Sequence, residues 1–191
     1  MKKILFFLVL SFGFAALAKS QLQVNVQWLK TTSGIKKDTL YYSPQAKLTW
    51  NDFYVRKEEG TNTAALTTSG FGFTAGIFSR SGQGLLDINV FCYFLPYKSW
   101  VKKGDTNDYI LNHEQHHFDI SYIGSCYFMQ KLKEARITMN NYSSVISKIY
   151  DEAYDYMSNM QDAYDRETDN GIIREKQEDW NKKVNARLTD L

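Results

Sequence analysis

The feature that most restricts the fold of this chain is a cluster of histidines near its middle. The only three histidines among the 191 residues are His113, His116 and His117, and they include the pattern His113-Glu114-x-x-His117. On an α-helix, residues four apart lie on one face about one turn from each other, so both imidazoles can reach one metal ion. Zn²⁺ is the expected ion, because it accepts neutral imidazole and leaves a coordination position open for chemistry. Glu114 would lie beside the metal and accept a proton from water.

The flanking sequence favours a helix around this cluster. Residues 105–107 (Asp-Thr-Asn) each have a capping side chain, Asp108 follows in the first turn, and neither Gly nor Pro occurs before Gly124. The alternative is an exposed helix that carries the pattern by chance, but the chain has no histidine elsewhere. We therefore predict a metal site at His113 and His117.

Two stripes run along this predicted helix. The stripe with the two histidines continues into Ser121 and Gly124, and these small residues leave room for a neighbouring element. The second stripe is expected to face the core. It consists of Phe118, Tyr122, Cys126 and Met129.

Two polar residues of the cluster are not predicted to bind the metal. Asp119 lies well away from the ligand positions around the helix, so we expect it to anchor a neighbouring element or to cap a backbone group. His116 is expected either to support the metal site from behind or to lie on the surface.

The N-terminal segment has the composition of a secretory signal peptide. Lysines precede an apolar run, and small residues suited to cleavage follow it before residue 20. A membrane anchor is the alternative, but the run is shorter than the roughly 18 residues that a span needs. The expected product is one secreted or periplasmic domain, residues 21–191. Secretion permits a disulfide between Cys92 and Cys126, with two buried thiols as the alternative.

The charge and apolarity of the expected mature chain argue against nucleic-acid binding and against a membrane span. Removing residues 1–20 takes away three of the 23 basic residues and none of the 21 acidic ones, so the domain is nearly neutral. This balance gives no indication of nucleic-acid binding. No later segment is apolar enough to span a membrane.

Residues 21–96 are predicted to form β-structure, because apolar residues alternate along several short segments. The predicted strands cover residues 24–28, residues 40–42, Leu48 to Trp50, residues 64–78 and residues 85–95. The last of these, residues 85–95, has apolar side chains on both faces, which indicates the central strand of the sheet.

Loops and glycines divide this β region. The charged residues 56–63 are expected to form a loop. Glycines at positions 70, 72 and 76 indicate bulges or the close approach of another backbone.

The chain after the histidine cluster is predicted to be helical. Apolar residues spaced three and four apart predict an amphipathic helix over residues 143–167, which residues 169–171 (Asp-Asn-Gly) end. A last helix is expected over residues 173–188. A sheet followed by three helices, the first of which carries the histidine pattern, is an α+β domain.

Several stretches match, in order, the pattern of one known family. They are residues 48–53 (LTWNDF), 64–70 (AALTTSG), 98–100 (KSW), 113–120 (HEQHHFDI) and 164–168 (YDRET), followed by Gln177 and Trp180. On these stretches the chain resembles the bacterial family of predicted secreted zinc-dependent proteases, domain of unknown function 922. The resemblance implies a zincin-like domain with a catalytic zinc on His113 and His117 and with Glu114 as the general base.

A zinc ion with two histidine ligands needs a third protein ligand, and a carboxylate is expected because no other histidine is suitably placed. The family-like acidic cluster makes Asp165 the first candidate and Glu167 the second. Glu152, in the middle of the same predicted helix, is the alternative. The family pattern often carries a histidine before the following glycine, where this chain has Asn170.

Three functions are consistent with these features. The first is a secreted zinc metallopeptidase whose peptide or protein substrate lies along an edge strand within residues 64–78. The second is a non-catalytic secreted binding protein on the same scaffold, which Asn170 favours and Glu114 opposes. The third is hydrolysis of a non-peptide amide such as a cell-wall crosslink. The candidate oxyanion partners are Tyr164, Tyr154 and His116.

Overall fold

The computed structural model describes residues 22–29, 38–57, 63–80 and 83–191, so the expected signal peptide lies outside the described residues. A strand-rich half precedes three helices, which confirms the predicted α+β class. The strands are β1 (Gln23–Trp28), β2 (Leu40–Tyr41), β3 (Val55–Lys57), β4 (Ala65–Leu66), β5 (Ser69–Arg80), β6 (Gln83–Phe94) and β7 (Trp100–Lys102). The helices are the short 3₁₀ helix η1 (Trp50–Asp52), α1 (Asp108–Glu134), α2 (Tyr142–Thr168) and α3 (Arg174–Thr189). None of the helices in the described part of the chain combines the length and apolarity that crossing a bilayer requires.

The larger of two mixed sheets is built around β6, as predicted. β5 pairs antiparallel with β6 along its whole length, while β1 pairs parallel with one end of β6 and β2 antiparallel with the other. Alternate residues of β6 from Leu86 to Phe94 are buried, because one face of the sheet is covered by helix. The smaller sheet has the strand order β3-β7-β4 and lies beside the N-terminal end of α1.

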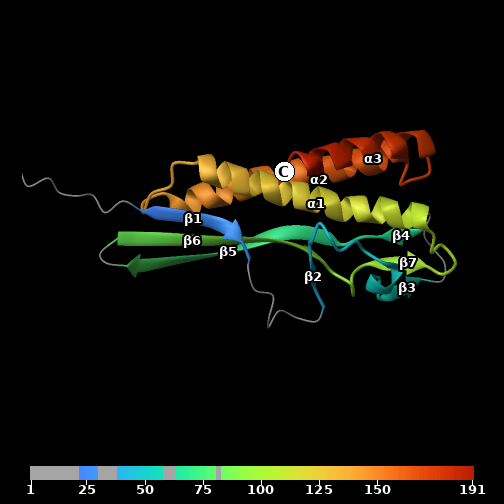
Figure 1. The fold of residues 1–191 in the computed structure, drawn as a ribbon, viewed down its shortest axis with the longest axis horizontal. Coiled ribbons are helices and arrows are strands. Elements are labelled where there is room, and N and C mark those ends of the chain that lie inside the picture. Colours follow the sequence, from blue (N-terminus) through green and yellow to red (C-terminus); the bar gives the residue numbers. More distant parts are fainter. Residues whose placement is uncertain (1–21, 30–37, 58–62, 81–82) are drawn as a thin grey trace, which may run out of the picture.

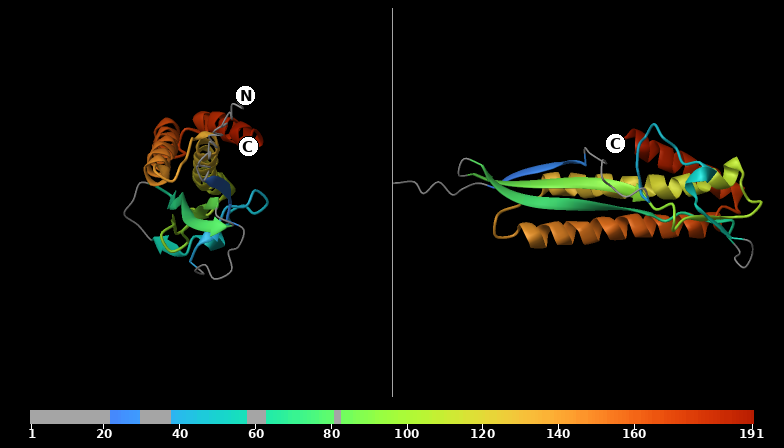
Figure 2. Two further views of the ribbon diagram at one scale, coloured as in Figure 1. Left: turned by 90° about the vertical axis from the view of Figure 1, so that its left-hand side faces the viewer. Right: turned by 90° about the horizontal axis from the view of Figure 1, so that it is seen from below.

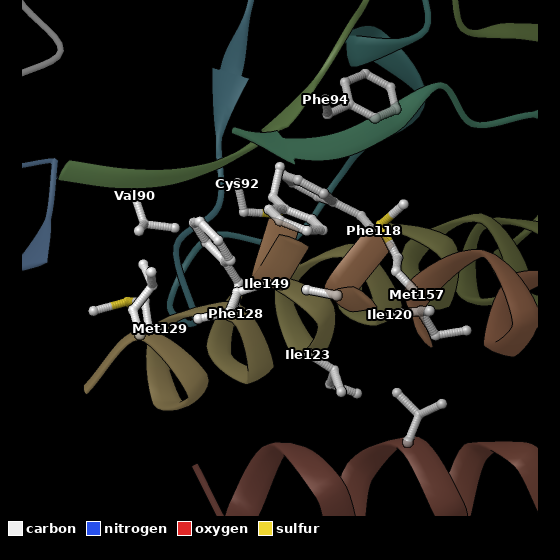
Figure 3. Close-up of a cluster of buried hydrophobic side chains, with 14 of the residues drawn as sticks. Val90, Cys92, Phe94, Phe118, Ile120, Ile123, Phe128, Met129, Ile149 and Met157 are labelled. Atoms are coloured by element: carbon white, nitrogen blue, oxygen red, sulfur yellow. The ribbon is translucent and has the colours of Figure 1, made fainter. Parts of the chain in front are cut away.

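All three helices lie on one face of the large sheet (Figures 1 and 2). α1 contacts both sheets, and α2 and α3 pack against α1. The apolar core lies between β6, α1 and α2, as Figure 3 shows. Its side chains include Val90, Cys92, Phe94, Phe118, Phe128, Met129, Ile149 and Met157.

The start of α1 and its stripes agree with most of the prediction. Among the possible caps, Asn107 is the one that acts, since its Oδ1 accepts a hydrogen bond from the Ile110 amide at 3.0 Å. Phe118 and Met129 of the second stripe are buried, as expected. Tyr122 and Cys126 of the same stripe are only half-buried.

The strand predicted at Leu48 to Trp50 is wrong. The amide and hydroxyl of Thr49 both donate to Asp52 Oδ2, at 2.7 and 2.8 Å, and this local bonding closes a 3₁₀ turn. Side chains that bond nearby backbone in this way compete with strand pairing. The amide of Leu48 donates instead to Gln115 Oε1 on α1, at 2.7 Å.

The loop predicted over residues 56–63 begins too early. Arg56 and Lys57 belong to β3, which pairs in parallel with β7, and residues 58–62 of the expected loop lie outside the described residues. The strand predicted over residues 64–78 is in fact two strands, β4 in the small sheet and β5 in the large one. Strands of two or three residues are too short for an alternating pattern to reveal.

The glycines of β5 do not mark bulges, because the pairing of β5 with β6 is unbroken from Ser69 to Arg80. They make room for side chains rather than for another backbone. A Cβ at Gly72 would lie 2.9 Å from the Phe91 ring, and one at Gly70 would lie 3.1 Å from the Tyr93 hydroxyl. The interpretation of these glycines as bulges or backbone contacts is therefore wrong.

Both cysteines are free thiols in the structure, Cys92 buried on β6 and Cys126 half-buried on α1. The unbridged alternative is therefore the one observed. Burial raises the pKa of both thiols, to about 11 at Cys126, so neither is a reactive thiolate near neutral pH.

Candidate metal centre

The site forms along the seam where α1 and α2 run side by side. A Cβ added at Gly124 of α1 would lie 2.8 Å from the Met157 Cβ of α2, so the predicted small stripe does admit a neighbouring helix. One turn along α2, the Gln161 amide donates to the Ser121 hydroxyl at 3.3 Å. One turn further, Asp165 reaches the histidines of α1.

Three ligand-type atoms converge at this point. The Nε2 atoms of His113 and His117 are 3.2 Å apart. Oδ1 of Asp165 lies 3.3 Å from the first and 3.0 Å from the second. All three atoms fall within 4.8 Å of one another, and the three residues form the single such metal-type group within the described residues.

This donor set suits a cation. Oδ1 of Asp165 is buried although 42% of the side chain is exposed, and no hydrogen bond of acceptable geometry reaches this oxygen from the described residues. The Nδ1 atoms of His113 and His117 face side-chain oxygens of Gln177 and Gln161 at 2.9 and 2.5 Å, which leaves both Nε2 atoms directed at Asp165. Two imidazole nitrogens and a carboxylate oxygen are a common set of protein ligands for catalytic zinc.

The charges of the site favour a cation as well. Burial disfavours the imidazolium of His117, but contact with Asp165 and the negative charge of Glu114 outweigh it and raise its pKa to about 9. Burial also opposes ionisation of Asp165, yet its contacts with His113 and His117 hold its pKa well below the usual range. A positive charge, either a proton or a metal ion, is therefore stabilised between these side chains.

A small cavity opens on the three ligand-type atoms, and Glu114 lines it. Oε2 of Glu114 is buried without a hydrogen-bond partner among the described residues. A buried carboxylate oxygen without a donor costs stability, so Glu114 is better suited to act on something that enters the cavity than to hold the fold together. The backbone beside it is held by Thr67, whose hydroxyl donates to the Glu114 carbonyl at 3.2 Å.

The walls of the cavity come from separate parts of the chain. One wall is the segment from Thr63 to Thr67, which includes β4. Another part of the lining contains Tyr109, Asn170 and Gly171. The Tyr109 hydroxyl donates to the Gly171 carbonyl at 2.6 Å, and this bond holds the turn after α2 against the start of α1.

Gly171 itself has a positive φ of 84°, and a Cβ there would lie 3.2 Å from the His113 Nδ1. Both its conformation and its closeness to the ring require glycine. The predicted end of α2 at residues 169–171 is thereby confirmed, and the turn also shapes the cavity.

The alternative acidic ligands lie elsewhere. Glu167 Oε2 accepts a hydrogen bond from the Trp180 indole at 2.8 Å. Glu152 is on the surface, where it accepts from Tyr127 at 2.6 Å and pairs with Lys131 at 3.5 Å. Of the three acidic candidates, the structure brings only Asp165 to the histidines.

The candidate oxyanion partners do not line the cavity. Tyr164 is fully buried, stacks on the His113 ring with 4.5 Å between centroids, and donates to the His113 carbonyl. Tyr154 is half-exposed on α2. His116 is buried between Asp119 and Asn181, at 3.1 and 2.9 Å. These three residues therefore have other roles.

Asp119 anchors a neighbouring segment, as predicted. Its carboxylate accepts hydrogen bonds from Tyr42 at 2.8 Å and Gln115 at 2.9 Å, and it lies 3.5 Å from the Lys47 ammonium. Burial opposes ionisation of Asp119, but its contacts with His116 and these neighbours outweigh it and lower its pKa. The segment between β2 and β3 is thus fixed to α1.

Sequence reasoning missed Gln161, Gln177 and Tyr109. Gln177 was part of the family resemblance, but nothing in the sequence indicated its contact with His113. Gln161 lies four residues before Asp165 on the same helix, and this spacing could have suggested that it faces the same histidines. Comparison with protein-family models, curated proteins and solved structures finds no match, so function is inferred from the site itself.

Proposed function

We propose that this protein is a secreted zinc-dependent metallopeptidase with a zincin-like domain. The observation that carries the proposal is the convergence of His113, His117 and Asp165 in a cavity that Glu114 lines, with Glu114 Oε2 unpartnered among the described residues. The resemblance to the family of predicted secreted zinc-dependent proteases and the signal-like N-terminus support the same function and location.

The described side chains of the site have separate roles in hydrolysis. His113, His117 and Asp165 would hold the ion. When bound, zinc supplies Lewis acidity, which polarises a carbonyl and makes water acidic near pH 7. Glu114 accepts the proton of the attacking water and returns it to the leaving amine; it lines the cavity, and its Oε2 accepts no hydrogen bond from the described residues.

The substrate is an extended peptide that lies beside β4. β4 is an edge strand of the small sheet, since among the described strands it pairs only with β7. The residues from Thr63 to Thr67 line the cavity, which brings this edge to the site. Free backbone groups at a strand edge bind extended peptides by adding a strand. Within the edge strand predicted over residues 64–78, we therefore assign peptide binding to β4.

A non-catalytic binding protein is the second candidate. Asn170 favours it, because this residue lines the cavity at the position where the family resemblance leads one to expect a histidine. Such a protein would bind zinc and peptide without cleaving the peptide.

Cleavage of a peptide library by zinc-loaded protein separates these candidates. We expect cleavage by the wild-type protein, loss on chelation, and recovery when zinc is restored. Glu114→Gln should retain zinc and lose about 10²–10⁴-fold in rate, because the amide cannot accept the proton. Glu134→Gln, at the exposed end of α1, is the matched control. Zinc binding without cleavage in the wild type would favour the binding protein, and equal rates for Glu114→Gln would exclude the general-base role.

A further inference from the structure

Two glutamines behind the histidines have their side-chain amides held in one orientation. Gln161 Nε2 donates to the His117 carbonyl at 2.8 Å, and because a carbonyl can only accept, the atom that faces it must be the nitrogen. The oxygen of Gln161 is therefore the atom at His117 Nδ1, 2.5 Å away.

The side-chain amide of Gln177 is also held in one orientation, but by different partners. Its Nε2 lies 2.6 Å from the Tyr164 hydroxyl, which itself donates to the His113 carbonyl, and 2.8 Å from Asn181 Oδ1. Both partners accept from Gln177, so its oxygen is the atom at His113 Nδ1, 2.9 Å away. Gln177 is completely buried, and water therefore does not replace these bonds.

An oxygen acceptor at Nδ1 decides which ring nitrogen carries hydrogen. Each glutamine oxygen requires an N–H at the Nδ1 that it faces, so the lone pair of a neutral ring is on Nε2. In both histidines Nε2 is the atom directed toward Asp165. The glutamines thus hold both rings in the one tautomer that can bind an ion between α1 and α2.

From this geometry we infer that Gln161 and Gln177 are positioning residues of the metal centre, which fix the tautomer and the ring orientation of His117 and His113. The inference rests on the proposed zinc site. The two glutamines are held by different helices. Gln161 of α2 is bonded directly to α1, through the His117 carbonyl and the Ser121 hydroxyl. Gln177 belongs to α3 and is held through Asn181.

The support of His113 extends further through the interior. Asn181 Oδ1 also lies 2.9 Å from His116 Nε2, and His116 Nδ1 lies 3.1 Å from Asp119. A chain of buried and partly buried polar contacts therefore runs from Asp119 to Gln177. This chain accounts for the burial of His116, which the mechanism of hydrolysis does not use, and it makes α3 part of the metal centre.

Zinc affinity and imidazole NMR test the inference together. Gln161→Met and Gln177→Met remove the acceptor at similar volume, and Gln130→Met, on the exposed face of α1, is the matched control. Loss of a group that orients a metal ligand typically costs about 10–100-fold in affinity, so we expect that loss in each of the first two variants and none in the control. Gln161→Asn, with its shorter side chain, provides a second and milder test that leaves the α3 contacts intact.

The ¹⁵N imidazole spectrum of the zinc-loaded protein gives a readout that simple destabilisation would not change. In the wild type we expect a slowly exchanging Nδ1–H on each ligand. Gln161→Met should speed exchange only at His117, and Gln177→Met only at His113.

Wild-type affinity in both Met variants, or zinc bound at Nδ1, would overturn the inference while leaving the metal centre intact. Absence of zinc binding in the wild-type protein would overturn the metal centre itself, and the inference with it.

Discussion

The two halves of α1 bury opposite kinds of side chain. Toward its N-terminal half the buried residues are largely polar: His113, Glu114, Gln115, His116, Asp119 and Ser121. Toward its C-terminal half they are largely apolar: Ile123, Phe128, Met129 and Leu132. Both halves pack against α2 and sheet, so the difference is in chemistry rather than in architecture.

The comparison shows where stability and function are separated. The apolar half gains stability from burial, which is largest for rings and branched chains. The polar half must satisfy each buried group, and it does so for His116 and Asp119 through several hydrogen bonds. It leaves Glu114 Oε2 without a hydrogen-bond donor among the described residues, and Glu114 lines the same cavity as Asp165 of α2.

Phe128→Ala should have the largest effect, and on stability alone. Phe128 is fully buried among the rings of Phe71, Phe73 and Tyr150, so its truncation should cost about 3–5 kcal/mol of unfolding free energy. Zinc affinity should not change, since residue 128 lies roughly 16 Å along the helix from His117. Urea unfolding and zinc titration measure both quantities.

The contrasting variant in the polar half is Glu114→Gln. It changes a buried side chain whose Oε2 accepts no hydrogen bond from the described residues, so its metal-free form should lose far less stability than Phe128→Ala does. A large loss of stability in Glu114→Gln would show that the polar half is built for stability as well.

Asp165→Ala should have the next largest effect, and on metal binding. The loss of a direct ligand should exceed the roughly 100-fold in affinity that the loss of a supporting group can cost. Glu167→Ala and Glu152→Ala should bind zinc as the wild type does, since both side chains have other partners. Retained affinity in Asp165→Ala, with a loss in either control, would assign the third ligand elsewhere.

A smaller effect is expected from pH. With the pKa of His117 raised to about 9, its ring is protonated in the metal-free protein near neutral pH, and zinc must displace that proton. Apparent zinc affinity should therefore rise by about tenfold per pH unit from pH 7 and level off above pH 9. In the metal-free protein the imidazolium stabilises the fold fully below pH 6.5, and this contribution is lost as the pH rises through about 9.

Calorimetric titrations in buffers of different ionisation enthalpy count the released proton. Affinity that is constant between pH 7 and 8 would contradict the charge arrangement around His117.

Much of the helical half could be predicted, because its signals are periodic. The spacing of His113 and His117 placed both rings on one face, and the small residues Ser121 and Gly124 predicted the approach of another helix. Predicting Asp165 as a ligand also needed the argument that zinc takes a third protein ligand, together with the family resemblance. Periodicity alone could not show it, because the contact of Asp165 with α1 depends on how the two helices pack.

The remainder depends on contacts that carry no periodic signal. The strand predicted at Leu48 to Trp50 does not form, because Thr49 and Asp52 make local hydrogen bonds that close a 3₁₀ turn instead. Gln161 and Gln177 resemble ordinary polar residues of a helix surface, and only the folded structure shows that their side chains face the histidines.

The most direct test of a zinc site on His113, His117 and Asp165 is the metal content of the purified protein by native mass spectrometry. We predict one zinc per chain for the wild type and for the surface control Gln130→Ala, because three ligand-type atoms converge at a single point. The His113→Ala, His117→Ala double variant should contain none. A wild-type protein that takes up no zinc when zinc is supplied, or a double variant that retains it at full occupancy, would contradict the metal centre described above.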